Sequence, residues 1–515
     1  MLWRRLIPAV VLALFVISSG APLRSQALPG LAGISVSYST QKRKVQPSGE
    51  LKAQIDALDR EIAEAQRRGR TGELRRLYAK GLTLLSGAAW TAELEFARSL
   101  VLRTDRVVVD PSATWTVRLE QIYEPSIALE HPLVARVLLR RAAGAARAGG
   151  IATPPAVIRE FGTRDGVSRD LRESPLNLPV DLTGLEDGQY QLAVDVLDGT
   201  SVLGSVVRPF AVHSGVDATV ARLRRAASTA PEVLRASILY PVDRMELVNR
   251  GALALASFRA AADFAAAEAV AAAASAGRNP FDGKTGDFTR HYRLDIAGEI
   301  MPYRLYVPTT YRAGTRHPLV IALHGLGGDE NSLFGGYSGM LQKLGEQHGF
   351  IVAAPLGYRP EGWYGWAGAI DRGDPEALRT IERSEADVMQ VLQQVKTLYA
   401  VDDTRIYLMG HSMGAIGTWH LGQKFPDVWA ALGPIAGIGD PKSVERIRHL
   451  PQFIVHGDAD ATVRVENSRA MVAALKPLGA SVTYVEVAGG DHVNVAVPNL
   501  PAMFEFFKKQ RKVQR

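Results

Sequence analysis

Arg405-Ile-Tyr-Leu-Met-Gly-His-Ser-Met-Gly-Ala415 is the stretch that decides the fold of the second half of the chain. Residues 405–409 read as a buried strand, and a helix is expected to begin near Ala415. Gly410 and Gly414 flank Ser412, where any side chain would collide with neighbouring backbone in a sharp turn. The pattern predicts a strained strand-to-helix turn that presents the hydroxyl of Ser412. The alternative is an ordinary serine that caps a helix.

The residues on either side of this turn repeat a pattern of strand, loop and helix. Short apolar runs without alternation are typical of strands buried on both faces of a parallel sheet, and they occur at residues 319–323, 350–354, 406–409, 432–436 and 453–455. Helical patterns lie between several of them, for example at 385–398 and 468–475. We therefore expect an α/β domain with a doubly wound, mostly parallel sheet. Gly277-Arg-Asn-Pro280 breaks the preceding helix, which places this domain at residues 280–515.

A glycine-rich segment, His324-Gly325-Leu326-Gly327-Gly328, directly follows the strand at 318–323. A serine that attacks an acyl group needs two backbone N–H groups aimed at the developing oxyanion. We expect one from Met413, the residue after the serine, and the other from Leu326, with His324 ordering the loop. The alternative is a glycine-rich turn without such a role.

The serine also needs a base, and the base needs an orienting carboxylate, in the chain order serine, acid, histidine. The strand at 452–455 ends in a turn with two candidate acids, Asp458 and Asp460. Asp458 lies at the strand end and suits a local turn, whereas Asp460 reaches further. Of the eleven histidines only His492 lies downstream of both, so it is the predicted base, and the adjacent Asp491 is expected to be structural.

Residues 280–515 resemble a branch of the α/β hydrolases that contains secreted polyhydroxybutyrate depolymerases, feruloyl esterases and predicted peptidases. The resemblance lies in Tyr303-Arg-Leu-Tyr-Val-Pro308, His324-Gly-Leu-Gly-Gly328, Gly410-His-Ser-Met-Gly414, His456-Gly-Asp-Ala-Asp460 and Asp491-His492. It implies the α/β-hydrolase fold, favours Asp460 over Asp458, and indicates a serine hydrolase of carboxylic esters that forms an acyl-enzyme. No cofactor is expected, and no cluster of Cys and His suggests a metal.

Two other functions remain open. One is a serine peptidase of the prolyl-oligopeptidase type, although the β-propeller of that family is absent here. The other is a catalytically inactive binding protein of the cell envelope.

The substrate is expected to contact loops around the serine. Gly362-Trp363-Tyr364-Gly365-Trp366 follows the fourth strand, and exposed aromatic rings there would stack on sugar or aryl groups. The alternative is that Trp363, Tyr364 and Trp366 pack the rim of the domain. Residues 437–450 are too short for a large lid, which favours an open site for bulky, polymeric or carbohydrate-linked esters.

The N-terminus has the layout of a secretory signal peptide. Arg4 and Arg5 precede an apolar run at residues 6–17, and Ser25-Gln-Ala27 offers small residues for cleavage. We expect a signal peptide at 1–27, a mature chain without a membrane span, and a periplasmic or extracellular location. The sequence contains no cysteine, which excludes disulfides, a thiolate nucleophile and a lipidated cysteine.

The region between the signal peptide and residue 280 is expected to form three parts. Leu51, Ile55, Leu58 and Ile62 recur at helical spacing in a helical segment at 28–104. Period-two alternation and turn dipeptides predict a small immunoglobulin-like β-sandwich at 105–215. Residues 216–279 read as an alanine-rich helical linker.

Composition narrows the class of partner. The 515 residues carry a formal charge of +7, which is small for so long a chain and is not gathered into a basic cluster with aromatic residues. Nucleic acid is therefore not expected as a partner.

Overall fold

The computed structural model describes residues 24–25, 31–127, 131–141, 156–370 and 373–512. The chain divides into two compact units, of which the first comprises residues up to 222 together with 244–265, and the second comprises 223–243 and 266–515. The predicted signal peptide lies outside the described residues, except that Arg24–Ser25 form a short strand, β1.

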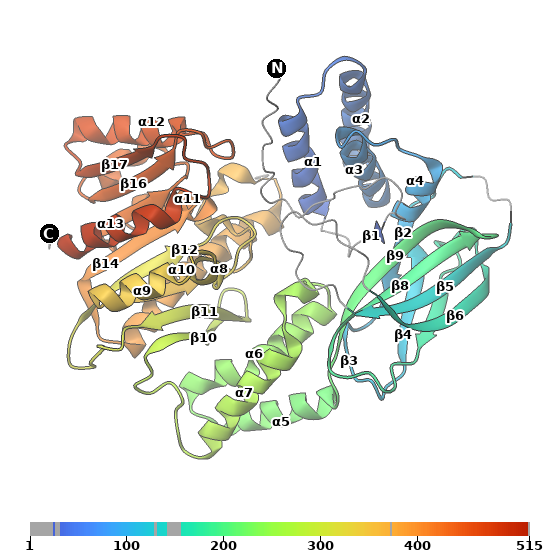
Figure 1. Ribbon diagram of the computed structural model, residues 1–515, viewed down its shortest axis with the longest axis horizontal. Coiled ribbons are helices and arrows are strands. Elements are labelled where there is room, and N and C mark those ends of the chain that lie inside the picture. Colours follow the sequence, from blue (N-terminus) through green and yellow to red (C-terminus); the bar gives the residue numbers. More distant parts are fainter. Residues whose placement is uncertain (1–23, 26–30, 128–130, 142–155, 371–372, 513–515) are drawn as a thin grey trace, which may run out of the picture. The chain divides into compact units, whose positions relative to one another are not determined.

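An eight-stranded sheet forms the centre of the second unit (Figure 1). Its strands are β10 (Gly286–Leu294), β11 (Glu299–Val307), β12 (His317–Leu323), β13 (Ile351–Pro355), β14 (Val401–His411), β15 (Ala431–Ile435), β16 (Gln452–Gly457) and β17 (Val482–Val487). They lie in the order β10-β11-β13-β12-β14-β15-β16-β17. Only the pairings of β10 with β11 and of β11 with β13 are antiparallel. This is the doubly wound, mostly parallel sheet expected from the apolar runs.

Helices cover both faces of this sheet. They are α8 (Ser332–Gly336), α9 (Met340–His348), α10 (Pro375–Leu398), α11 (Met413–Lys424), α12 (Glu466–Leu475) and α13 (Ala496–Lys509). Successive residues of a strand point to opposite faces, so β15 shows the arrangement directly. A Cβ on Gly422 of α11 would touch Leu432, whereas a Cβ on Gly433 would touch Met503 and Phe507 of α13. Helices α11 and α13 therefore pack on opposite faces, and Ser412 lies where β14 enters α11.

The first unit contains helices and two sheets. The helices are α1 (Leu31–Val45), α2 (Gly49–Arg67), α3 (Thr71–Leu85) and α4 (Ala92–Ser99). One sheet contains β2 (Leu100–Arg103), β4 (Trp115–Gln121) and β7 (Leu176–Val180); the other contains β1, β3 (Val108–Val109), β5 (Leu133–Arg141), β6 (Val157–Val167), β8 (Gly188–Asp198) and β9 (Ser201–Val212). The rings of Trp115 in β4 and Phe210 in β9 lie 4.5 Å apart, which packs one sheet on the other. The immunoglobulin-like character of this region stays a prediction.

The alanine-rich region forms α5 (Val216–Thr229), α6 (Glu232–Asn249), a 3-10 turn at Leu255–Ser257 and α7 (Ala260–Ser275). Within the second unit, Tyr240 of α6 stacks on His291 with ring centroids 4.0 Å apart. Within the first unit, the side chain of Asn249 accepts hydrogen bonds from the amides of Val107 and Val108. This region therefore contributes packing to each unit, and the five-part division drawn from the sequence stays a prediction.

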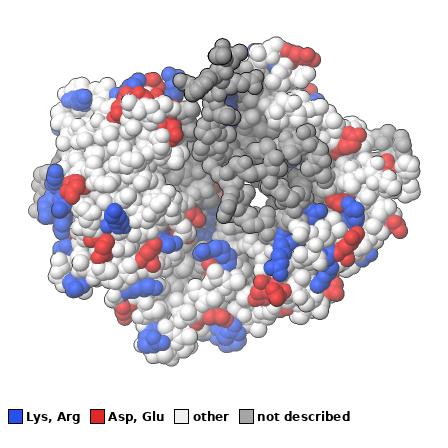
Figure 2. All heavy atoms as spheres, viewed as in Figure 1, with Lys and Arg blue, Asp and Glu red and all other residues white. Residues whose placement is uncertain are grey.

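Two properties of the described part of the chain bear on its partners. No helix among these residues combines the length and the apolar composition needed to cross a bilayer. Basic and acidic side chains are interspersed on the face drawn in Figure 2.

Candidate active site

The turn around Ser412 has the strained geometry that its sequence predicts. Ser412 adopts φ 59° and ψ −119°, between the end of β14 and the first residue of α11. A Cβ on Gly410 would lie 2.2 Å from the carbonyl oxygen of Gly414, and one on Gly414 would lie 2.0 Å from that of Leu323. Both glycines are therefore required by the close approach of backbone, and the turn rests against the end of β12.

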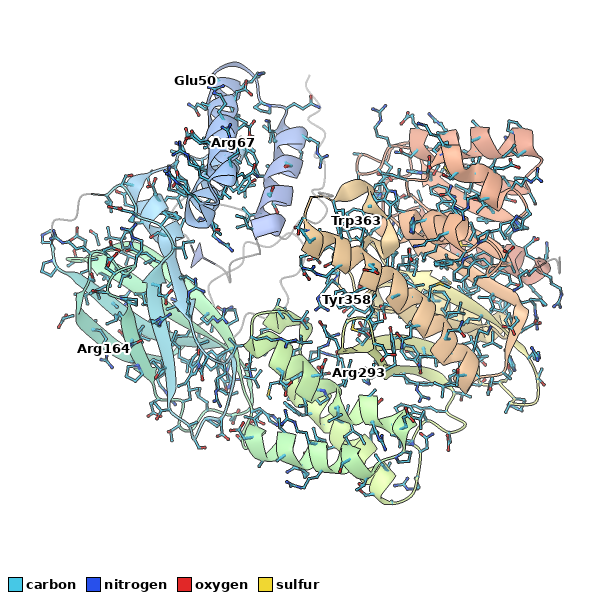
Figure 3. All side chains as sticks on the ribbon, turned by 180° about the vertical axis from the view of Figure 1, so that it is seen from behind. Glu50, Arg67, Arg164, Arg293, Tyr358 and Trp363 are labelled. Atoms are coloured by element: carbon cyan, nitrogen blue, oxygen red, sulfur yellow. The ribbon has the colours of Figure 1, made fainter. Side chains whose placement is uncertain are left out.

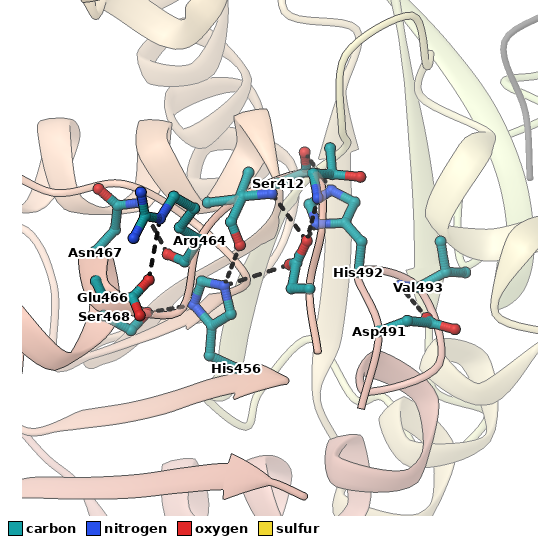
Figure 4. Close-up of polar contacts among 12 residues, drawn as sticks. Ser412, His456, Arg464, Glu466, Asn467, Ser468, Asp491, His492 and Val493 are labelled. Carbon is teal, nitrogen blue, oxygen red and sulfur yellow. Dashed lines mark hydrogen bonds and ion pairs between the residues drawn. The ribbon is translucent and has the colours of Figure 1, made fainter. Parts of the chain in front are cut away.

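Ser412, His492 and Asp460 form a continuous chain of hydrogen bonds (Figure 4). Nε2 of His492 lies 2.9 Å from Oγ of Ser412, and Nδ1 lies 2.7 Å from Oδ2 of Asp460. Because a carboxylate only accepts, Nδ1 carries the proton, and Nε2 is left free to accept the proton of the serine. The structure thus brings together the predicted nucleophile, base and acid from the loops after β14, β17 and β16.

The two candidate acids occupy different environments. Asp460 is buried, and its Oδ1 accepts hydrogen bonds from the amides of Thr462 and Val463, each at 2.8 Å. Asp458 is exposed and accepts a hydrogen bond from the amide of Gly489 at 2.7 Å, so it ties the two loops together. The adjacent Asp491 caps its own loop by accepting from the amides of Val493 and Asn494.

The hydrogen bonds around Asp460 stabilise its ionised form. Burial alone would raise the pKa of this carboxyl group, but hydrogen bonds from His456, His492 and the amide of Val463 outweigh it. The pKa therefore lies well below its usual range. Asp460 is a carboxylate at any pH near neutrality.

Sequence reasoning missed the part that His456 has in this site. The ring is fully buried, with Nδ1 2.7 Å from Oγ of Ser468. Its Nε2 lies 2.9 Å from the carbonyl oxygen of Val463 and 3.3 Å from Oδ2 of Asp460. Both neighbours of Nε2 are acceptors, so this nitrogen carries the proton. Its hydrogen bond to Val463 fixes the loop that contains Asp460. The available signal was its position at the end of β16, four residues before Asp460.

His411, the residue before the serine, is hydrogen-bonded to the loop that contains His492. Its Nε2 donates a hydrogen bond of 2.7 Å to the carbonyl oxygen of His492. Burial outweighs this bond and lowers the pKa of His411 to about 4, so the ring is neutral near neutral pH. The loops of acid and base also pack together, since a Cβ on Gly457 would lie 2.1 Å from the carbonyl oxygen of Gly490.

The predicted oxyanion donors lie on the two segments nearest the serine. Met413 is the first residue of α11, so its N–H has no partner within the helix. A Cβ on Gly325 would lie 3.4 Å from Cβ of Ser412, which places the glycine-rich loop against the nucleophile. The side chain of Leu326, the next residue, is 55% exposed. Leu326 therefore directly follows the residue that borders the serine, and its side chain faces solvent.

The aromatic residues at 363–366 differ in one respect from the prediction. Trp363 and Trp366 are partly exposed, with ring centroids 5.7 Å apart, and Figure 3 shows Trp363 on this part of the chain. Tyr364 is 0% exposed, and its hydroxyl donates to the carbonyl oxygen of His324 at 3.1 Å. The prediction that Tyr364 contacts substrate is therefore wrong. Left-handed backbone at Trp363 and Tyr364, with φ 57° and 52°, turns successive side chains outward and inward.

Metal ligands would need several His, Asp or Glu side chains to converge. Within the described ranges, no group of three or more such side chains is arranged to hold a metal ion.

Part of this chain is similar in sequence to known esterases. Residues 296–514 match the family model described as putative esterase. A bifunctional acetylxylan esterase/xylanase of Neocallimastix patriciarum is 28% identical over 30% of this chain and 21% of its own length. Poly(3-hydroxyalkanoate) depolymerase C of Paucimonas lemoignei is 34% identical over 23% of this chain and 28% of its own length.

A solved structure, described as a thermostable esterase, is 19% identical with a TM-score of 0.38, covering 79% of this chain and 98% of that one. The chain spans less than a third of the length of either curated relative. The resemblance expected from the sequence motifs is confirmed for the second half of the chain. Residues 296–514 are thus similar to the family described as putative esterase.

Proposed function

We propose that this protein hydrolyses carboxylic esters, with Ser412 as nucleophile, His492 as general base and Asp460 as the residue that orients the base. The observation that carries this proposal is the hydrogen-bonded chain from Ser412 through His492 to Asp460, on a strained turn where the serine is partly exposed. The match of residues 296–514 to an esterase family supports the same chemistry.

The geometry suggests two steps. Nε2 of His492 takes the proton of Ser412 as the oxygen attacks the ester carbonyl, and the imidazolium is stabilised by the carboxylate of Asp460. The amides of Met413 and Leu326 stabilise the oxyanion of the tetrahedral intermediate. The alcohol leaves with the proton from His492, and water then cleaves the acyl-enzyme by the same route.

The surroundings of the serine favour an ester with apolar groups. Leu326, within the glycine-rich loop, and Val493, next to the base in sequence, are each 55% exposed. Trp363 and Trp366 add partly exposed rings on the loop after β13. Together with the short connection between β15 and β16, these side chains suit a bulky substrate. We propose polymeric or carbohydrate-linked esters, the chemistry named for the xylan and polyhydroxyalkanoate relatives.

The remaining expectations from the sequence are part of the same proposal. We propose export through the N-terminal signal peptide, with action in the periplasm or outside the cell. We also propose that the two sheets of the first unit form an immunoglobulin-like accessory domain.

Turnover of p-nitrophenyl esters and of peptide p-nitroanilides, by the wild type and by Ser412→Ala, tests the function. We expect ester turnover that falls by at least about a thousandfold in the variant, because the remaining site offers only binding and oxyanion stabilisation. Turnover of anilides alone would instead identify a peptidase. Absence of turnover together with absence of labelling by a fluorophosphonate would refute both. A panel of feruloyl, acetyl-sugar and hydroxyalkanoate esters then identifies the acyl group.

A further inference from the structure

Tyr364 lies fully buried behind the glycine-rich loop at residues 324–328. Its hydroxyl donates to the carbonyl oxygen of His324 at 3.1 Å, and its ring meets the ring of His324 edge-on with centroids 5.7 Å apart. The ring also packs against Gly417 of α11, where a Cβ would lie 2.6 Å from the Tyr364 side chain. The phenol thus contacts both the glycine-rich loop and the helix that begins at the nucleophile.

The backbone around Tyr364 is held in an uncommon conformation. Trp363 and Tyr364 are consecutive non-glycine residues with positive φ, which persists only where the surroundings fix it. The amide of Tyr364 donates to Oγ of Ser384 in α10 at 3.1 Å. A second bond joins the two loops, from the amide of Gly327 to the carbonyl oxygen of Pro360 at 2.9 Å. The loop at residues 356–366, termed the aromatic loop below, is therefore a rigid support for residues 324–328.

The bond from Tyr364 lies one peptide before the peptide group that carries the N–H of Leu326. In a planar trans peptide this N–H points opposite to the carbonyl of Gly325, so fixing that carbonyl fixes the direction of the N–H. Nδ1 of His324 lies 2.7 Å from the carbonyl oxygen of Gly325, and Nε2 lies 2.7 Å from that of Leu356. Burial lowers the pKa of His324, so a neutral ring donates to only one of the two. The bond from the Tyr364 hydroxyl to the carbonyl oxygen of His324 forms whichever ring nitrogen of His324 carries the proton.

We propose that Tyr364 is a positioning residue, which through its hydroxyl fixes the His324 main chain and thereby aims the Leu326 amide at the oxyanion. This inference rests on the proposed function and deepens it. The aromatic loop then has two tasks, because Trp363 faces outward from the residue next to Tyr364. Contact with substrate and support of the oxyanion donor come from adjacent residues of one loop.

Tyr364→Phe in the full chain tests the inference, since it removes the hydroxyl and little volume. The matched control is Tyr407→Phe, because the hydroxyl of buried Tyr407 donates to the carbonyl oxygen of Gln510 at 2.8 Å, a bond that touches neither the glycine-rich loop nor the triad. We expect kcat of Tyr364→Phe to fall about five- to tenfold with KM little changed, as one hydrogen bond supports the transition state only indirectly. Affinity for an aryl boronic acid, which forms a tetrahedral serine adduct, should fall by the same factor.

Tyr407→Phe should lower the melting temperature about as much as Tyr364→Phe does. Its kcat and its affinity for the boronic acid should stay at the wild-type values. Unchanged kcat and boronate affinity in Tyr364→Phe, or equal losses in Tyr407→Phe, would overturn the inference. Ser384→Ala, which removes the acceptor of the Tyr364 amide, provides a second variant with a smaller expected loss of kcat in the same direction. Failure of the proposed function looks different, because the wild type would then hydrolyse no ester, or its turnover would persist in Ser412→Ala.

Discussion

His411 shows how one buried side chain adds a dependence on pH to the stability of the site. In the folded chain its pKa is about 4 because burial disfavours the charged ring. In the unfolded chain a histidine has its ordinary pKa of about 6.5. Between these two values the unfolded state binds the extra proton, so stability falls as the pH falls from about 6.5 to about 4.

Replacement of His411 by glutamine should remove this part of the pH dependence. The introduced side-chain amide does not titrate and keeps a donor for the carbonyl oxygen of His492, which His411 now contacts. We expect the melting temperature of the wild type to fall more between pH 7 and pH 4.5 than that of His411→Gln. Parallel curves for the two proteins would show that His411 is protonated equally in the folded and unfolded states.

At the scale of elements, the turn between β14 and α11 depends on its second glycine. The added methyl of Gly414→Ala would lie 2.0 Å from the carbonyl oxygen of Leu323, which belongs to a central strand and has no room to move. We expect a loss of about 1–3 kcal/mol in the free energy of unfolding, as for other overpacked positions. Displacement of Ser412 should also lower ester turnover by about a hundredfold.

Gly335→Ala is the matched control for this substitution. Gly335 lies in α8, and a Cβ there would meet nothing within 4 Å. Stability should change by less than about 1 kcal/mol, with turnover retained. Equal effects of the two substitutions on turnover would contradict the steric argument. Chemical denaturation and p-nitrophenyl ester assays measure both quantities.

Much of this element structure was predictable because it is local. The strand before Ser412, the helix after it and the continuous apolar strands follow from hydrophobic runs and glycine spacing, which act over a few residues. The preference for Asp460 over Asp458 needed a resemblance to known proteins, since both aspartates follow the same strand. The buried position of Tyr364 was not predictable, because it follows from left-handed backbone and from packing against Gly417, far away in sequence.

The role of His456 was hidden for a similar reason. Its contact with Ser468 forms only when α12 packs beside β16, and the sequence around a lone histidine at a strand end does not indicate such a contact. At this scale, sequence patterns identify which residues carry chemistry. They do not identify which residues hold those groups in place.

At the scale of the whole molecule, part of the alanine-rich region packs into the second unit. Tyr240 lies in the region expected to connect domains, yet it is buried and stacks on His291 of β10. The amide of Ile300 in β11 donates to Asp243 of the same helix at 3.0 Å. Residues of α6 therefore help to stabilise the unit that contains Ser412.

Tyr240→Ala should lower the temperature at which ester turnover is lost. Removal of a buried aromatic ring costs about 3 kcal/mol or more, and the lost contact lies within the second unit. Tyr190→Ala, at a buried tyrosine that stacks on Phe210 in the first unit, is the control. We expect it to destabilise the first unit with a smaller effect on the temperature of inactivation. A larger effect of Tyr190→Ala would show that the two units unfold together.

The partly exposed serine of the strained turn has a practical consequence. Because the sequence contains no cysteine, Ser412→Cys would give a protein with a single thiol, placed 2.9 Å from an imidazole where Oγ now lies. A neighbouring histidine favours the reactive thiolate. A fluorescent maleimide would then attach at one position, and its emission would report the docking of ester polymers without any turnover.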